Sequence, residues 1–114
     1  MVEYLCNELD TIPGVSYYRD DMMNIYATKG ELSDGEFYPM FIAHTDTVHR
    51  IVDIEIIEDP NEEDFLYGVE KNSKKRTGCG GDNKAGVYVC LELLKRVEVL
   101  KAAFFVSEEY GCFG

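Results

Sequence analysis

The sequence has few of the features that mark secreted, membrane-spanning or nucleic-acid-binding proteins. Its four cysteines are too few for a disulfide scaffold and lack Cys-x-x-Cys spacing. No run approaches the ~18 consecutive apolar residues of a membrane helix. The first ten residues carry three acidic side chains and no basic one, unlike a signal peptide. These absences predict a protein of the reducing cytoplasm with no membrane partner.

Basic side chains are also scarce. The chain has 11 lysines and arginines against 22 acidic residues, for a net charge of −11. Phosphate backbones and anionic membranes would repel such a chain, which excludes nucleic-acid binding as a function. The apolar fraction of 46% over 114 residues is typical of a globular protein with its own core. We therefore expect a single domain over residues 1–114.

The hydrophobic pattern alternates between strand-like and helix-like segments. Apolar residues spaced i, i+3, i+4 and i+7 predict a short helix starting at Val2 and a longer one over 83–97. Strands are predicted over 15–19, 23–28, 39–43, 51–58, 65–69 and 102–106, with an acidic loop over 59–64 and a basic loop over 71–76. Two continuous apolar runs, 39–43 and 102–106, are typical of buried strands. This order predicts an α/β fold, with a mixed β-sheet and flanking helices.

Polar side chains gather where the buried strands end. His44 and Asp46 follow the first apolar run, and Glu108 and Glu109 follow the second. Asp82 begins the longer helix, directly after a glycine-rich segment. Open α/β sheets bind ligands beyond the carboxyl ends of their strands, so we expect these residues to share one crevice.

Each of these residues also has a simpler interpretation. His44 and Asp46 project to the same side of an extended segment, as a metal ligand and its orienting carboxylate would, but also as a surface pair would. Asp82 fits a metal ligand or a helix N-cap. Adjacent strand residues point in opposite directions, so Glu108 and Glu109 can serve one site only if a loop begins there.

Three segments together resemble a known family. Residues 43–48 (AHTDTV), 78–86 (GCGGDNKAG) and 104–114 (FFVSEEYGCFG) resemble the three metal motifs of the M20, M28 and M42 co-catalytic zinc peptidases. The lysine and glycine of the second segment favour the M20 branch, near its tripeptide-aminopeptidase-like members. The resemblance implies a three-layer αβα fold, of which this chain is the N-terminal portion of the catalytic domain.

The resemblance also implies a role for each candidate residue. His44 would ligate one zinc ion, Glu109 the other, and Asp82 would bridge the two, with Co²⁺ or Mn²⁺ as possible substitutes. Asp46 would orient His44, and Glu108 would be the general base that deprotonates a metal-bridged water. The implied reaction is hydrolysis of amide bonds in peptides or N-acyl amino acids. The implied peptide bond between Asp82 and Asn83 is cis.

The resemblance is incomplete at its C-terminal side. It implies a second histidine ligand and a further carboxylate after Glu109, whereas the other histidine, His49, belongs to the first motif. We therefore expect little peptidase activity from this chain alone, and either self-association through an uncovered sheet or a complementing C-terminal chain. Two alternatives remain: a catalytically incompetent metal-binding or interaction module, and a thiol hydrolase that uses Cys79 or Cys112 with His44 as base.

Overall fold

The computed structural model describes residues 1–48 and 53–113. They divide into two compact units, one of Met1–Asp46 with Asp82–Gly114 and one of Thr47–Gly81. The sequence predicts a single domain, and the proposal that both units belong to one catalytic domain stays a prediction. No helix among the described residues has the length and apolar character that crossing a membrane requires.

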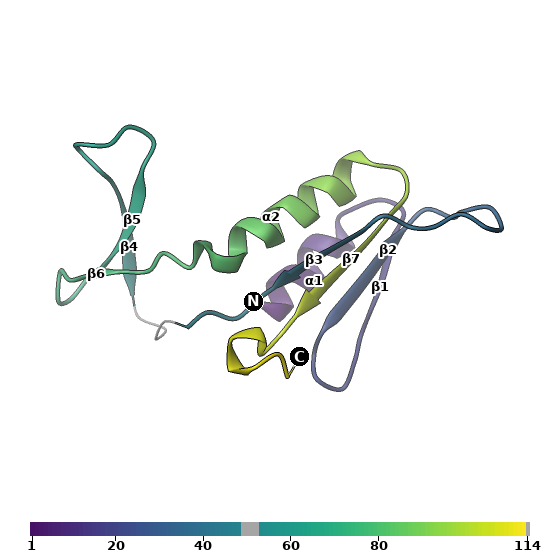
Figure 1. Ribbon diagram of the computed structural model, residues 1–114, viewed down its shortest axis with the longest axis horizontal. Helices are drawn as coiled ribbons and strands as arrows, with labels where there is room; N and C mark the ends of the chain where they lie inside the picture. The colour runs from purple at the N-terminus through teal and green to yellow at the C-terminus, as the bar shows by residue number, and fades with distance from the viewer. Residues whose placement is uncertain (49–52, 114) are drawn as a thin grey trace. The chain divides into compact units, whose positions relative to one another are not determined.

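The larger unit is built on a four-stranded sheet (Figure 1). The strands are β1 (Val15–Arg19), β2 (Ile25–Lys29), β3 (Met40–His44) and β7 (Leu100–Phe105), in the order β1-β2-β7-β3. β1 and β2 are antiparallel, as are β2 and β7, whereas β3 runs parallel to β7. The predicted α/β class with a mixed sheet is therefore confirmed.

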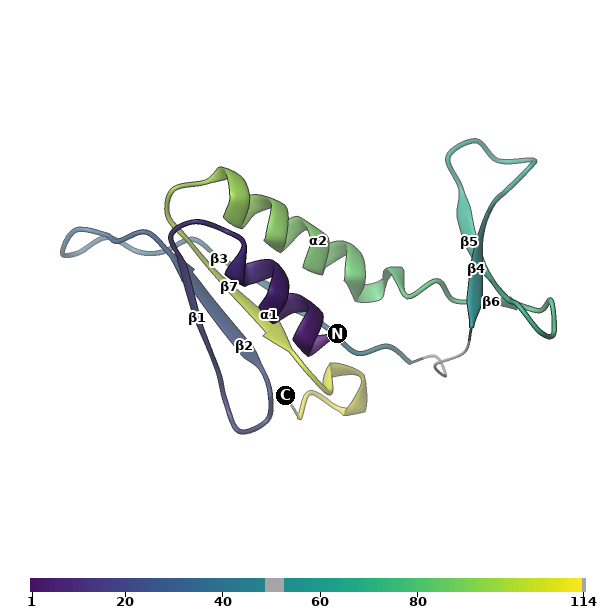
Figure 2. The ribbon, with the colours of Figure 1, turned by 180° about the vertical axis from the view of Figure 1, so that it is seen from behind.

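Two helices, α1 (Val2–Asp10) and α2 (Gly81–Arg96), pack against this sheet. Both contribute to one buried cluster with the strands, and its members include Leu5, Leu9, Ile25, Ala43, Val87, Leu91, Leu94 and Phe104. The helices run side by side in Figure 2, and Lys95 Nζ of α2 lies 4.0 Å from a carboxylate oxygen of Glu8 in α1. Both helices therefore lie on one face of the sheet, so the described residues form two of the three expected layers.

The opposite face of the sheet is open to solvent. Ile42 of β3 is 61% exposed and Tyr18 of β1 is 63% exposed. β3 is also an edge strand, because β7 is its one strand neighbour in the described ranges 1–48 and 53–113. Edge strands with apolar side chains are prone to pair with other chains. The expected self-association stays a prediction, which sedimentation of the purified chain tests.

The smaller unit is a three-stranded antiparallel sheet of β4 (Ile54–Glu58), β5 (Leu66–Glu70) and β6 (Arg76–Thr77). The prediction of a loop up to Arg76 is wrong at its end, since Arg76 pairs with Val69 and its guanidinium lies 4.4 Å from the ring centroid of Tyr67. A two-residue strand is too short to show a periodic pattern, so its strand conformation depends on pairing with β5. Residues 51 and 52 of the predicted strand 51–58, and His49, lie outside the described residues.

Candidate metal centre

The parallel strands β3 and β7 bring two of the predicted motifs to one edge of the sheet. His44 is the last residue of β3, and the backbone N–H of Thr45 donates a hydrogen bond of 2.8 Å to the carbonyl of Phe105 at the end of β7. Ser107 then takes a left-handed conformation, with φ of 59°, and the short 3₁₀ helix η1 (Glu108–Tyr110) follows. The break in the strand that lets both glutamates serve one site is therefore present.

Helix α2 delivers Asp82 to the same edge. Asp82 and Asn83 have non-helical backbone angles, and the side-chain oxygen of Asn83 accepts a hydrogen bond of 3.0 Å from the N–H of Gly86. Asn83 therefore caps the regular part of the helix, and Asp82 keeps its carboxylate available for His44. A side chain at position 86 would collide with Asn83, which explains the glycine there. The Asp82–Asn83 peptide bond is cis, as the resemblance predicts.

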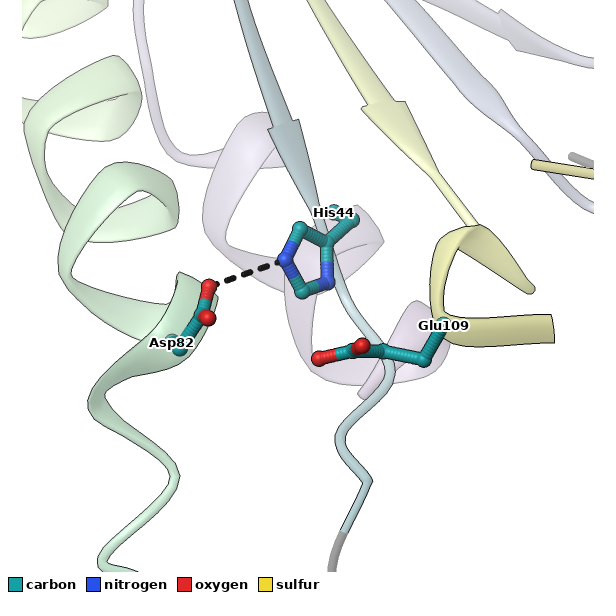
Figure 3. A group of neighbouring side chains, drawn as sticks. All are labelled: His44, Asp82 and Glu109. Carbon is teal, nitrogen blue, oxygen red and sulfur yellow. Dashed lines mark hydrogen bonds and ion pairs between the residues drawn. The ribbon is translucent and has the colours of Figure 1, made fainter. Parts of the chain in front are cut away.

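His44, Asp82 and Glu109 form a cluster of metal-ligating side chains (Figure 3). His44 Nε2 lies 3.0 Å from Asp82 Oδ1, and one donor atom from each of the three residues lies within 4.8 Å of the others. Glu108 Oε2 is 3.9 Å from His44 Nε2. The structure thus brings three of the five predicted residues into one cluster and places a fourth, Glu108, beside it.

The chemistry of this donor set fits a divalent cation. A neutral imidazole nitrogen and a carboxylate oxygen are both acceptors unless a proton or a metal ion lies between them. Zinc bonds to such atoms at about 2.0–2.2 Å, so three ligands around one ion lie roughly 3–4 Å apart. The donor atoms of His44, Asp82 and Glu109 lie within 4.8 Å of one another, close to this spacing.

The electrostatic environment of His44 favours a positive charge. Burial lowers the pKa of His44, but the hydrogen bond to Asp82 and the charges of Glu108 and Asp82 outweigh this effect, so the net pKa is raised. Its Nδ1 also faces an acceptor, the backbone carbonyl of Asp46, at 3.2 Å. In the metal-free chain, a proton on His44 Nε2 therefore makes this nitrogen a hydrogen-bond donor to the carboxylates that we expect to bind a metal.

This raised pKa predicts a pH-dependent stability of the metal-free chain. Protonated His44 stabilises the fold below the ordinary histidine pKa of about 6.5, and the contribution disappears as pH rises through the raised pKa. Urea midpoints measured in the presence of a chelator should therefore decrease as the pH rises above about 6.5. The His44→Asn variant should lose this slope, and an unchanged slope would contradict the assignment to His44.

Asp46 holds the third motif against the first. Its Oδ1 accepts a hydrogen bond from the N–H of Glu108 at 3.2 Å, and its Oδ2 accepts one from the N–H of Glu109 at 3.1 Å. Burial raises the pKa of Asp46, but these and other backbone hydrogen bonds, with the nearby His44, lower it overall. Asp46 is therefore held as a carboxylate beside the candidate metal ligands.

A further residue supports the site without a signal in the sequence. Asn24 is 2% exposed, and its side-chain oxygen accepts a hydrogen bond of 2.8 Å from the N–H of Val106, two residues before Glu108. Asp20 fixes Asn24 through its side-chain amide and backbone N–H, both at 2.9 Å. In the sequence these residues look like an ordinary turn, since only the β2–β7 pairing brings them to Val106.

The environment of Cys112 does not favour the thiol alternative. Cys112 Sγ lies 3.6 Å from Glu108 Oε1, and the charge of that carboxylate raises the pKa of the thiol. A nucleophilic cysteine requires the opposite shift. Cys79 is exposed in the smaller unit. The geometry therefore favours the metal interpretation over a thiol hydrolase.

Comparison with known proteins supports the fold directly. Neither protein-family models nor curated proteins match this chain. Among solved structures it is similar to aminopeptidase PepT from Bacillus cereus, with a TM-score of 0.66 and 23% identity, and to a tripeptidase from Staphylococcus aureus, with a TM-score of 0.65 and 21% identity. Each match covers 96% of this chain and 31% of the other, so the chain spans about a third of each neighbour. The chain thus has the fold of one part of these peptidases, in agreement with the motif resemblance.

Proposed function

We propose that residues 1–114 form the N-terminal portion of the catalytic domain of an M20-type metallopeptidase, which hydrolyses amide bonds of peptides or N-acyl amino acids in the cytoplasm. The observation that carries the proposal is the cluster of His44, Asp82 and Glu109 donor atoms within 4.8 Å of one another, with Glu108 beside it. The likeness to a tripeptidase and an aminopeptidase supports a peptide as the substrate.

The proposed metal ligands are His44 for one zinc ion, Glu109 for a second, and Asp82 between them. Bound zinc would polarise the scissile carbonyl and lower the pKa of the attacking water. The main chain fixes His44 for this task, because its Nδ1 faces the carbonyl of Asp46 and leaves Nε2 for the metal. The Asp82 side chain is 85% exposed, so its second oxygen is accessible to a further ion.

Glu108 is the proposed general base. Its carboxylate lies 3.9 Å from His44 Nε2, close to the reacting groups, and its side chain is 45% exposed. It therefore reaches both the metal ligands and solvent, as a residue that accepts a proton from water must. Its backbone is held by Asp46, so the position of the base relative to His44 is fixed.

Metal binding by the purified chain tests this proposal. We expect calorimetric titration with Zn²⁺ to show saturable binding, weaker than at a closed four-ligand site because three donors hold the ion. The His44→Ala variant should lose this binding, whereas Asp59→Ala, which removes a carboxylate from the smaller unit, should retain it. Equal binding by the wild type and the His44 variant would place the metal elsewhere.

A second candidate function is a metal-binding module without catalysis. The cluster contains three donor residues, whereas the resemblance implies five protein ligands for two metal ions. A site with too few ligands for two ions favours metal binding without catalysis. Zinc binding by the 114-residue chain, with no hydrolysis of tripeptides by that chain, is the result expected for both candidates. Hydrolysis after addition of a chain that supplies a histidine and a carboxylate would distinguish the peptidase.

A further inference from the structure

We propose that Asp46 is a positioning residue for Glu108 and Glu109, and that its carboxylate serves this task in preference to orienting His44. The inference rests on the proposed function, which makes Glu108 the base and Glu109 a ligand. Asp46 lies in the first motif, and the two glutamates lie in the third motif, 62 and 63 residues further along the chain. One carboxylate therefore connects two motifs that the sequence separates.

The geometry shows a helix cap supplied from a distant segment. The first N–H groups of any helix lack partners within the helix and need acceptors from elsewhere. In η1 the N-cap residue, Ser107, gives no side-chain hydrogen bond to this turn among the described residues. The two oxygens of Asp46 instead accept the N–H groups of Glu108 and Glu109, at 3.2 and 3.1 Å. Asp46 thus performs the capping that the local sequence does not.

The orientation of His44 depends less on this carboxylate. The shorter polar contact of His44 Nδ1 is with the backbone carbonyl of Asp46, at 3.2 Å, whereas Asp46 Oδ1 lies 3.5 Å away. A main-chain carbonyl is retained whatever side chain stands at position 46. Hydrogen bonds from N–H groups to an ionised carboxylate are stronger than those to a neutral acceptor. Replacing Asp46 should therefore displace Glu108 and Glu109 more than it displaces the imidazole of His44.

The Asp46→Asn variant separates these roles. It preserves size but replaces one acceptor oxygen with an NH₂ group, which cannot accept a hydrogen bond. In the metal-free chain we expect amide hydrogen exchange at Glu108 and Glu109 to accelerate by about 10–100-fold, because a charge-assisted bond is lost. The imidazole signals of His44 should change little. Asp59→Asn is the matched control, since Asp59 accepts an N–H bond from Asn61 in the smaller unit.

Cobalt titration then links positioning to the metal site. Asp46→Asn should weaken Co²⁺ binding by about 10–100-fold, the usual effect of losing a group that orients a ligand. Unchanged exchange at both glutamate amides, or a change confined to His44, would overturn the inference. If the wild type binds no Co²⁺ but the amide effect is present, the proposed function fails and the positioning role of Asp46 stands.

A measurement on the unaltered chain covers the case in which Asp46→Asn does not fold. Scalar couplings across hydrogen bonds connect an amide nitrogen with the carbon of the accepting carboxyl group. We expect such couplings from the amides of Glu108 and Glu109 to the side-chain carboxyl carbon of Asp46. Their absence from both amides in a folded chain would overturn the inference without any variant.

Discussion

Replacing Glu108 with glutamine is expected to lower peptide hydrolysis by about 10²–10⁴-fold, the usual contribution of a general base. Glutamine keeps the shape of the side chain but cannot take up a proton from water. Glu108 lies 3.9 Å from His44 Nε2 and is proposed as a base rather than a ligand, so zinc affinity should remain nearly unchanged. The measurement is steady-state tripeptide hydrolysis by the complete enzyme, with zinc content determined in parallel.

The matched control for this prediction is Glu63→Gln, which makes the same change in the acidic loop of the smaller unit and should leave hydrolysis unchanged. A parallel loss of zinc and activity in Glu108→Gln would show that Glu108 is a ligand. The 114-residue chain alone should hydrolyse tripeptides little or not at all. Chelator-sensitive hydrolysis by the purified monomer would contradict that expectation, and His49 and Cys112 would be the first residues to test.

The second large effect is expected from Asp82→Asn. A neutral amide is a poor zinc ligand, and Asp82 is the closest carboxylate to His44 Nε2, at 3.0 Å. Losing a residue that only orients a metal ligand lowers metal affinity by about 10–100-fold. We expect the loss of zinc affinity in Asp82→Asn to be larger, because a ligand itself is removed. Calorimetric titration of the purified chain measures this loss without requiring catalysis.

Asp82→Asn should also alter the metal-free chain. The hydrogen bond to Asp82 is the leading cause that raises the pKa of His44, so the variant should bring that pKa down. NMR titration of the imidazole measures this change, and Asp10→Asn, an exposed carboxylate on α1, serves as the control. Zinc affinity equal to that of the wild type would remove Asp82 from the ligand set.

The sequence predicted the main strands and helices because their side-chain patterns are local. The apolar run 39–43 corresponds to β3, displaced by one residue, and 102–106 overlaps β7. The helical stripe of Val87, Leu91 and Leu94 is buried against the sheet, whereas Val89, an apolar residue of the same helix, is 48% exposed. Position 89 lies beyond the face that the sheet covers, and periodicity alone does not fix how wide that face is.

Polar clusters at strand ends predicted the site for a similar reason. Parallel pairing of β3 with β7 places both carboxyl ends at one edge, so His44 and the two glutamates meet there once the sheet forms. The glycine-rich start of the longer helix predicted Asp82, the motif resemblance added the cis peptide bond, and the structure contains both. The ligand and base roles stay predictions until metal binding and hydrolysis are measured.

The sequence by itself determined the alternation of elements and the acidic surface, because composition and periodicity are properties of neighbouring positions. The motif resemblance implied which residues are the candidate metal ligands. Only the tertiary structure decided that both helices cover one face and that Asp46 caps η1. Each of these outcomes depends on which polar or apolar group comes within contact distance after the strands pair. Such contacts join residues that are distant in sequence, so no local pattern encodes them.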